Sequence, residues 1–74
     1  MVATALTNNI RKLRFEHGEM TQKQLADITG CTRQTINAIE AAKYAPSLEL
    51  AFKIARVFDL KVEDVFFYAD EQGN

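Results

Sequence analysis

Residues 21–40, TQKQLADITGCTRQTINAIE, constrain the fold of this chain more than any other stretch. Their apolar residues recur at helical rather than alternating spacing, and Gly30 interrupts the pattern in the middle. Thr21 and Gln24 have the spacing of a capping box, in which each side chain bonds the free backbone N–H of the other residue. Thr32 is placed to cap a second helix. The stretch therefore predicts two short helices joined by a tight turn at Gly30.

Three more segments of the chain have apolar residues at helical spacing. In the first, Leu6, Ile10, Leu13 and His17 fall on one face, and Gly18 follows directly. Glycine suits the left-handed position that ends a helix, and histidine suits the negative C-terminal end. We therefore expect a first helix that includes Leu6 and ends at His17.

The last two predicted helices follow Pro46, with Ser47 as the N-cap of the fourth helix. A short fifth helix is expected from about Val62, with Val65 and Phe66 facing inward. The fourth helix is the most apolar of the five. The residues expected to face inward from it are Leu48, Ala51, Phe52, Ile54, Ala55 and Phe58.

The chain length of 74 residues suits one small domain. We expect an all-α, compact five-helix domain over residues 1–74, with a tail at about 69–74. A chain of this size buries only about 60% of the surface that its unfolded form exposes. The single Cys31 and the single His17 can form neither an internal disulfide nor a four-ligand zinc site. Helical packing and a dimer are therefore the expected sources of stability.

The two helices within residues 21–40 have the dimensions of a helix-turn-helix, in which a turn containing glycine sets two helices at a steep angle. Such an arrangement exposes the N-terminal half of the second helix, which can enter the major groove of DNA. The chain also resembles the lambda-repressor-like helix-turn-helix regulators, the Xre family, and especially their short single-domain members. The resemblance runs from about Ile10 to Phe66 and rests on IRKLR, MTQKQLAD, TRQTINAIE, KYAPSLELAFKIARVF and VEDVF.

This resemblance implies DNA contacts from both helices of the motif and from the loop after them. Gln22, in the first turn of its helix, is expected to contact a phosphate together with free backbone N–H groups. Arg33 and Gln34 are expected to contact bases, since arginine can form two hydrogen bonds with guanine and glutamine two with adenine. Lys43 and Tyr44 resemble positions that contact the DNA backbone. The full expected set is Thr21, Gln22, Arg33, Gln34, Thr35, Asn37, Ala38, Lys43 and Tyr44.

Arg14 and Glu40 match family positions at which an ion pair ties the first helix to the end of the third. Arg14 borders the apolar face of its helix, where an unpaired charge would be costly. The resemblance therefore implies a structural role for the pair. The glycine that the family usually has before Lys43 is absent, because the sequence reads AAK. Ala42 must then adopt a left-handed conformation, unless the third helix runs longer.

The formal net charge of −1 raises the question whether this chain can bind nucleic acid. Residues 1–43 contain six Lys and Arg and four Asp and Glu, a net charge of +2. Residues 44–74 contain three and six, a net charge of −3. The half with the expected DNA contacts is therefore mildly basic. This small excess predicts weak nonspecific binding and a limited salt dependence per subunit.

A dimer is expected because one recognition helix reads only a few base pairs, whereas two copies related by a twofold read two half-sites one helical turn apart. Val65, Phe67 and Tyr68 belong to a C-terminal apolar cluster that is too large to face one small core, and they are the expected dimer contacts. The residues VFFYA also have the composition of a short strand at that interface. Phe15 is either a lone exposed aromatic or a second contact.

Together with the resemblance, these features predict a sequence-specific DNA-binding transcriptional regulator, a repressor that binds an inverted-repeat operator as a homodimer. The alternative is a protein-interaction module on the same fold, an antitoxin or a transcription adaptor. No Ser/His/Asp or Cys/His arrangement, phosphate loop or metal cluster points to an enzyme or a cofactor, and no small-molecule ligand is evident. No apolar run approaches the roughly 20 residues that span a bilayer. We expect a cytoplasmic protein, associated with the nucleoid when it binds double-stranded DNA.

Overall fold

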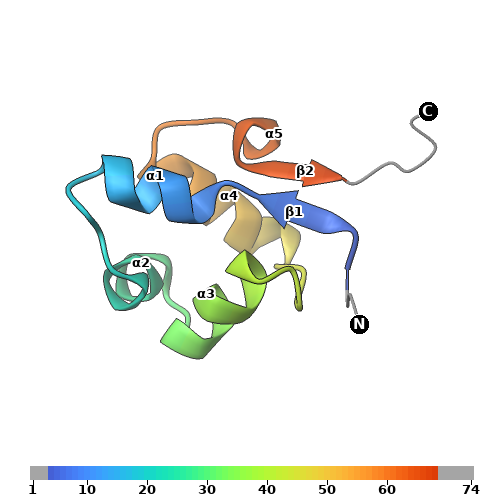
Figure 1. The fold of residues 1–74 in the computed structure, drawn as a ribbon, viewed down its shortest axis with the longest axis horizontal. Helices are drawn as coiled ribbons and strands as arrows, with labels where there is room; N and C mark the ends of the chain where they lie inside the picture. The colour runs from blue at the N-terminus through green and yellow to red at the C-terminus, as the bar shows by residue number, and fades with distance from the viewer. Residues whose placement is uncertain (1–3, 69–74) are drawn as a thin grey trace.

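In the computed structural model, residues 4–68 are described, and they form five helices and a two-stranded sheet (Figure 1). The expected tail at 69–74 lies outside the described residues. The two strands lie at one end of the molecule, and α2 and α3 lie side by side at its lower edge (Figure 1). In chain order the elements are β1 (Leu6–Asn8), α1 (Ile10–Glu16), α2 (Gln22–Thr29), α3 (Arg33–Glu40), α4 (Leu48–Val57), α5 (Val62–Val65) and β2 (Phe66–Tyr68).

The fold is mostly helical, as expected, and a small two-stranded sheet is added to the five helices. β1 and β2 pair in antiparallel fashion, so that Leu6 lies opposite Tyr68 and Asn8 opposite Phe66. The prediction that Leu6 belongs to the first helix is therefore wrong. The helix begins at Ile10, whose backbone N–H donates to the Asn8 side-chain oxygen at 3.1 Å. The expected C-terminal strand is present, and its partner is β1 of the same chain.

All five helices contribute to one apolar core. Among its fully buried side chains are Ile10, Leu25, Ile36, Ile54 and Val65, one from each helix. Val65 is therefore part of the interior of the domain. Its expected inward position is confirmed, and its expected place among the dimer contacts is wrong.

Two residues of α4 are exposed although they were expected to face inward. The buried residues of this helix include Ala51, Ile54 and Ala55, which define its inner face. Phe52 lies about 100° around the helix from Ala51, and its side chain is 49% exposed. Leu48, in the first turn, is 72% exposed and lies outside the core cluster.

The predicted caps of the helix-turn-helix are confirmed. Thr21 and Gln24 form the expected capping box, with N–H to side-chain distances of 3.0 and 2.8 Å. Thr32 accepts a bond from the backbone N–H of Thr35 at 3.1 Å. Gly30 ends α2 with a φ of 79°, a conformation that a side chain would strain. These contacts fix the lengths of α2 and α3 and the turn between them.

Candidate nucleic-acid interface

The helix α3 has a buried face and a polar exposed face. Ile36 and Ile39 are buried, whereas Arg33, Gln34 and Asn37 are exposed. The other two residues expected to contact DNA from this helix, Thr35 and Ala38, are half-buried. Arg33 and Gln34, in the first turn of α3, are thus exposed to solvent, as in a recognition helix that approaches the edges of bases.

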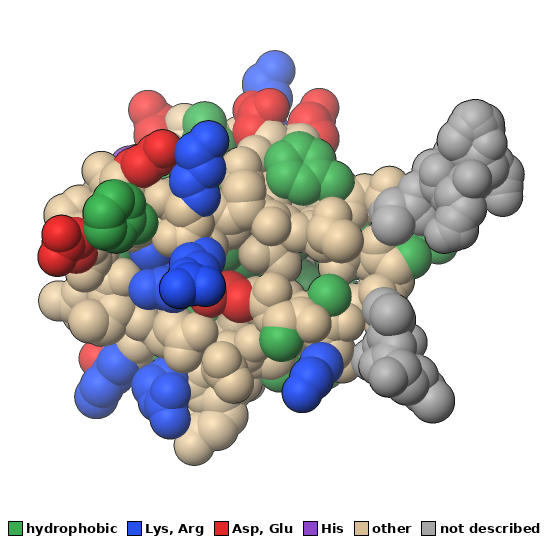
Figure 2. Space-filling view, in the orientation of Figure 1, with side chains coloured by type: hydrophobic (Ala, Val, Ile, Leu, Met, Phe, Trp, Pro, Cys, Tyr) green, Lys and Arg blue, Asp and Glu red, His purple; other side chains and the backbone are tan. Residues whose placement is uncertain are grey.

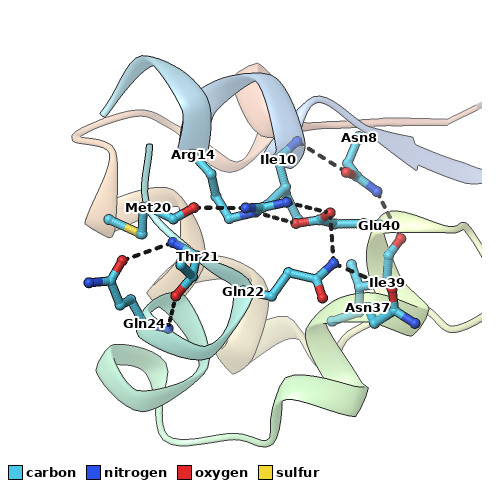
Figure 3. A network of polar contacts seen from close by, with 10 residues as sticks. All are labelled: Asn8, Ile10, Arg14, Met20, Thr21, Gln22, Gln24, Asn37, Ile39 and Glu40. Carbon is cyan, nitrogen blue, oxygen red and sulfur yellow. Dashed lines mark hydrogen bonds and ion pairs between the residues drawn. The ribbon is translucent and has the colours of Figure 1, made fainter. Parts of the chain in front are cut away.

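An ion pair between Arg14 and Glu40 ties α1 to the C-terminal end of α3, as expected (Figure 3). Arg14 donates from Nε and from a terminal nitrogen to the two carboxylate oxygens of Glu40, at 2.7 and 3.1 Å. Its remaining nitrogen donates to the backbone oxygen of Met20 at 2.7 Å. The two side chains are only 15% and 10% exposed, so solvent screens the pair weakly. This network holds α1, the α1–α2 loop and α3 together.

Gln22 joins the same network from the first turn of α2 (Figure 3). Its amide nitrogen donates to Glu40 Oε1 at 3.1 Å and to Asn37 Oδ1 at 3.4 Å. Gln22, which the sequence predicts to contact a phosphate, is thus bonded to two residues of α3. Sequence reasoning did not predict these two contacts.

A second tie to α3 comes from Asn8, which sequence reasoning missed. Its side-chain nitrogen donates to the backbone oxygen of Ile39 at 2.9 Å, while its side-chain oxygen accepts from Ile10 N–H (Figure 3). Asn8 therefore joins the β1–α1 junction to the last turn of the exposed helix. The available signal was an Asn-Asn pair directly before a helical pattern, which is typical of a helix start.

The end of α3 positions the loop that contains Lys43 and Tyr44. Lys43 N–H bonds the Ala38 oxygen at 2.9 Å, and Ala42 N–H bonds the Ile39 oxygen at 3.0 Å. This is the Schellman pattern of a helix end. It requires a left-handed conformation at the residue directly after the C-cap, Ala41. Ala42 takes that place with a φ of 59°, so the predicted left-handed conformation is confirmed. Lys43 and Tyr44 are both exposed directly after this turn.

The charges near α2 and α3 are mostly positive. A hollow of about 500 Å³ lies beside the start of α2, and its charged lining residues are Arg11, Arg14, Lys23, Arg33 and a single acid, Glu19. In the face shown in Figure 2, basic side chains predominate over α2 and α3, and most acidic ones lie toward the opposite edge. The expected charge asymmetry of the chain is therefore visible on this face as a basic region around the exposed helix.

Within residues 4–68, no group of His, Cys, Asp and Glu side chains could hold a metal ion. The same described part of the chain contains no helix long and apolar enough to cross a membrane. Cys31 is a free, half-buried thiol.

These features, two capped helices around a glycine turn and a polar face on the second, define a helix-turn-helix domain. Residues 10–65 match the model of a helix-turn-helix family. The chain belongs to this family, of the Xre type, and the resemblance found in the sequence is confirmed.

Curated relatives of similar length support this assignment. One from Methanocaldococcus jannaschii, named an uncharacterized HTH-type transcriptional regulator, is 49% identical over 67 residues, which are 90% of this chain and 100% of the relative. One from Bacillus subtilis with the same type of name is 44% identical over 66 residues, 89% of this chain and 98% of the relative. The fold is similar to that of a proposed DNA-binding protein from Bacteroides fragilis, with a TM-score of 0.70 at 22% identity, over 84% of this chain and 98% of that one.

Proposed function

We propose that this protein is a sequence-specific DNA-binding transcriptional regulator, and that it reads its site through α3 in the major groove. The observation that carries the proposal is the set of exposed polar side chains on α3, Arg33, Gln34 and Asn37. The cap of Thr32 and the Arg14–Glu40 ion pair hold this helix at its two ends. Arginine and the amide side chains are the residues that form paired hydrogen bonds with bases. The regulators named among the relatives support the same function.

The residues around α3 would hold the DNA backbone. Lys43 and Tyr44 are exposed in the loop after it, and Arg11 and Lys23 lie around the hollow at the start of α2. Positive side chains attract phosphates without regard to sequence and so set the position of the protein on the duplex. Thr21, as the N-cap of α2, lies beside the same hollow.

The proposal includes a homodimer that binds an inverted repeat and acts as a repressor in the cytoplasm. Phe67 and Tyr68 are neighbours on β2 and are 45% and 74% exposed, so this strand presents an apolar surface to solvent. β1 and β2 are the only strands within residues 4–68, so the outer edge of each has no partner there. An apolar strand with a free edge is a surface onto which a second copy can pack.

Selection of binding sites from a random duplex library tests this function. We expect the wild-type protein to enrich an inverted repeat. Arg33→Ala and Gln34→Ala should each weaken the base preference at one position in both half-sites. Each lost base contact should cost about 1–3 kcal/mol of discrimination. Arg56→Ala is the matched control, because Arg56 is exposed on α4 and lines a separate hollow with Asp59 and Leu60. If the folded wild-type protein enriches nothing at low salt, the proposed function fails, and a protein-interaction module becomes the better account.

A further inference from the structure

The contacts of Gln22 determine which end of its side-chain amide faces the network. A carboxylate can only accept hydrogen bonds, and Glu40 is the carboxylate partner of Arg14. The group that meets Glu40 Oε1 at 3.1 Å must therefore be the NH2 end of Gln22. The orientation follows from the chemistry of the partner, because amide oxygen and nitrogen are otherwise hard to distinguish.

The same NH2 group determines the orientation of Asn37. It has two hydrogens, and its second contact is to the side-chain oxygen of Asn37 at 3.4 Å. The oxygen end of Asn37 therefore faces Gln22, and its own NH2 group is the end left free. Asn37 is exposed on α3 and lines a hollow of about 420 Å³ with Gln22 and Glu40.

We propose that the chain of contacts from Arg14 through Glu40 and Gln22 to Asn37 sets the base preference of α3, by making Asn37 present hydrogen-bond donors to a guanine. This inference rests on the proposed DNA-binding function and names the base class for one of its side chains. Asparagine that is free to turn forms a pair of bonds with adenine, which needs its oxygen as well as its nitrogen. With the oxygen engaged by Gln22, the free NH2 fits an edge that offers only acceptors, and guanine offers two, N7 and O6.

In this account Gln22 is a positioning residue. Both of its N–H bonds are used by Glu40 and Asn37, and its remaining polar atom is an oxygen. A phosphate oxygen is also an acceptor, so the side chain of Gln22 can bond a phosphate only by giving up one of these contacts, whereas its backbone N–H has no partner within the helix and stays available. The effect of its side-chain amide on base preference passes through Asn37.

The test is base preference in site selection with Gln22→Met, which keeps the length of the side chain and removes its amide. Asn37→Ala first identifies the base position that Asn37 reads, and we expect guanine there in the wild-type site. In Gln22→Met, Asn37 is free to turn and accept adenine, so the guanine-to-adenine ratio at that position should fall about tenfold, the size of one good base contact. Positions altered by Arg33→Ala or Gln34→Ala should keep their preference. The double variant Gln22→Met with Asn37→Ala should match Asn37→Ala alone at that position.

Gln24→Met is the matched control, since Gln24 lies on the same helix and contacts Thr21 but neither Asn37 nor Glu40. It should leave the guanine-to-adenine ratio unchanged. An unchanged ratio in a folded Gln22→Met protein would overturn the inference. So would a preferred base other than guanine at the Asn37 position, or an Asn37→Ala effect that weakens all sequences equally. A wild-type protein that enriches no site at all would instead contradict the proposed function.

Discussion

At the scale of single residues, Glu40 is the side chain of α3 that joins Arg14 and Gln22 in one network. It accepts two bonds from Arg14 and one from Gln22 and is only 10% exposed. Glu40, on α3, is therefore bonded to side chains from two other helices, α1 and α2. Its loss would leave a guanidinium with little solvent and no countercharge.

We expect Glu40→Ala to lower the free energy of unfolding by about 3 kcal/mol, since removing one partner leaves a largely buried charge unpaired. Urea denaturation measures this. Glu49→Ala is a suitable control, because its pair with Lys53 is exposed, has a distance of 3.7 Å and should contribute less than about 1 kcal/mol. Equal losses in the two variants would contradict the structural role of Glu40.

Ala42 is a second residue whose conformation leads to a prediction. Its φ of 59° is left-handed, which costs a non-glycine residue about 1–2 kcal/mol. Ala42→Gly should therefore raise the free energy of unfolding by about 1 kcal/mol, or the midpoint of thermal unfolding by roughly 4–8 °C.

The neighbouring residue provides the control for this change. Ala41 has a φ of −85°, so Ala41→Gly relieves no strain and should lower stability through the greater freedom of the unfolded chain. If both glycines change stability in the same direction, the left-handed turn at Ala42 stores no strain.

At the scale of elements, the helices could be predicted from the sequence because their signals are local. Thr21, Thr32 and Ser47 each cap a helix where the polar residue precedes an apolar periodic run. The short β1 could not be predicted, because three residues show no period and Leu6 is spaced four residues before Ile10, as in a helix. Its position depends on pairing with β2, about 60 residues further along the chain.

The candidate site was predictable to a similar extent. Helical spacing and family resemblance predicted the exposure of Arg33 and Gln34. They also predicted the ion pair of Arg14 with Glu40. The contacts of Gln22 and of Asn8 with α3 did not, because they depend on how separate elements pack. Leu48 and Phe52 were misplaced for the same reason, since an apolar residue on a small domain can lie outside the core.

The contact of Asn8 with α3 gives a prediction for this scale. Asn8→Ala removes the bonds to Ile39 O and Ile10 N–H, so we expect a loss of about 1–2 kcal/mol in the free energy of unfolding. Hydrogen exchange should become faster at the last turn of α3, which Asn8 holds. Thr7→Ala is the control, because Thr7 bonds only the exposed Phe67 oxygen. Faster exchange across the whole protein, with no excess at α3, would argue against a specific tie.

At the scale of the whole molecule, the proposed homodimer leads to a prediction. If Phe67 and Tyr68 form the contact between two copies, Tyr68→Asp should weaken the dimer, and sedimentation equilibrium should show a lower average mass at the same concentration. Affinity for the selected duplex should fall with it, since two half-sites are then no longer bound together. Phe15→Asp, at an exposed aromatic on α1, is the comparison. An unchanged mass for Tyr68→Asp would place the contact elsewhere.

The most direct test of the central claim, that α3 reads DNA, is a titration of isotope-labelled protein with its selected duplex, followed by amide chemical shifts. We predict that the largest changes fall on residues 33–38, with smaller ones at the start of α2 and at Lys43 and Tyr44. A scrambled duplex should produce weaker changes that do not concentrate on α3. Changes centred on α4 or β2, with α3 unaffected, would contradict the claim.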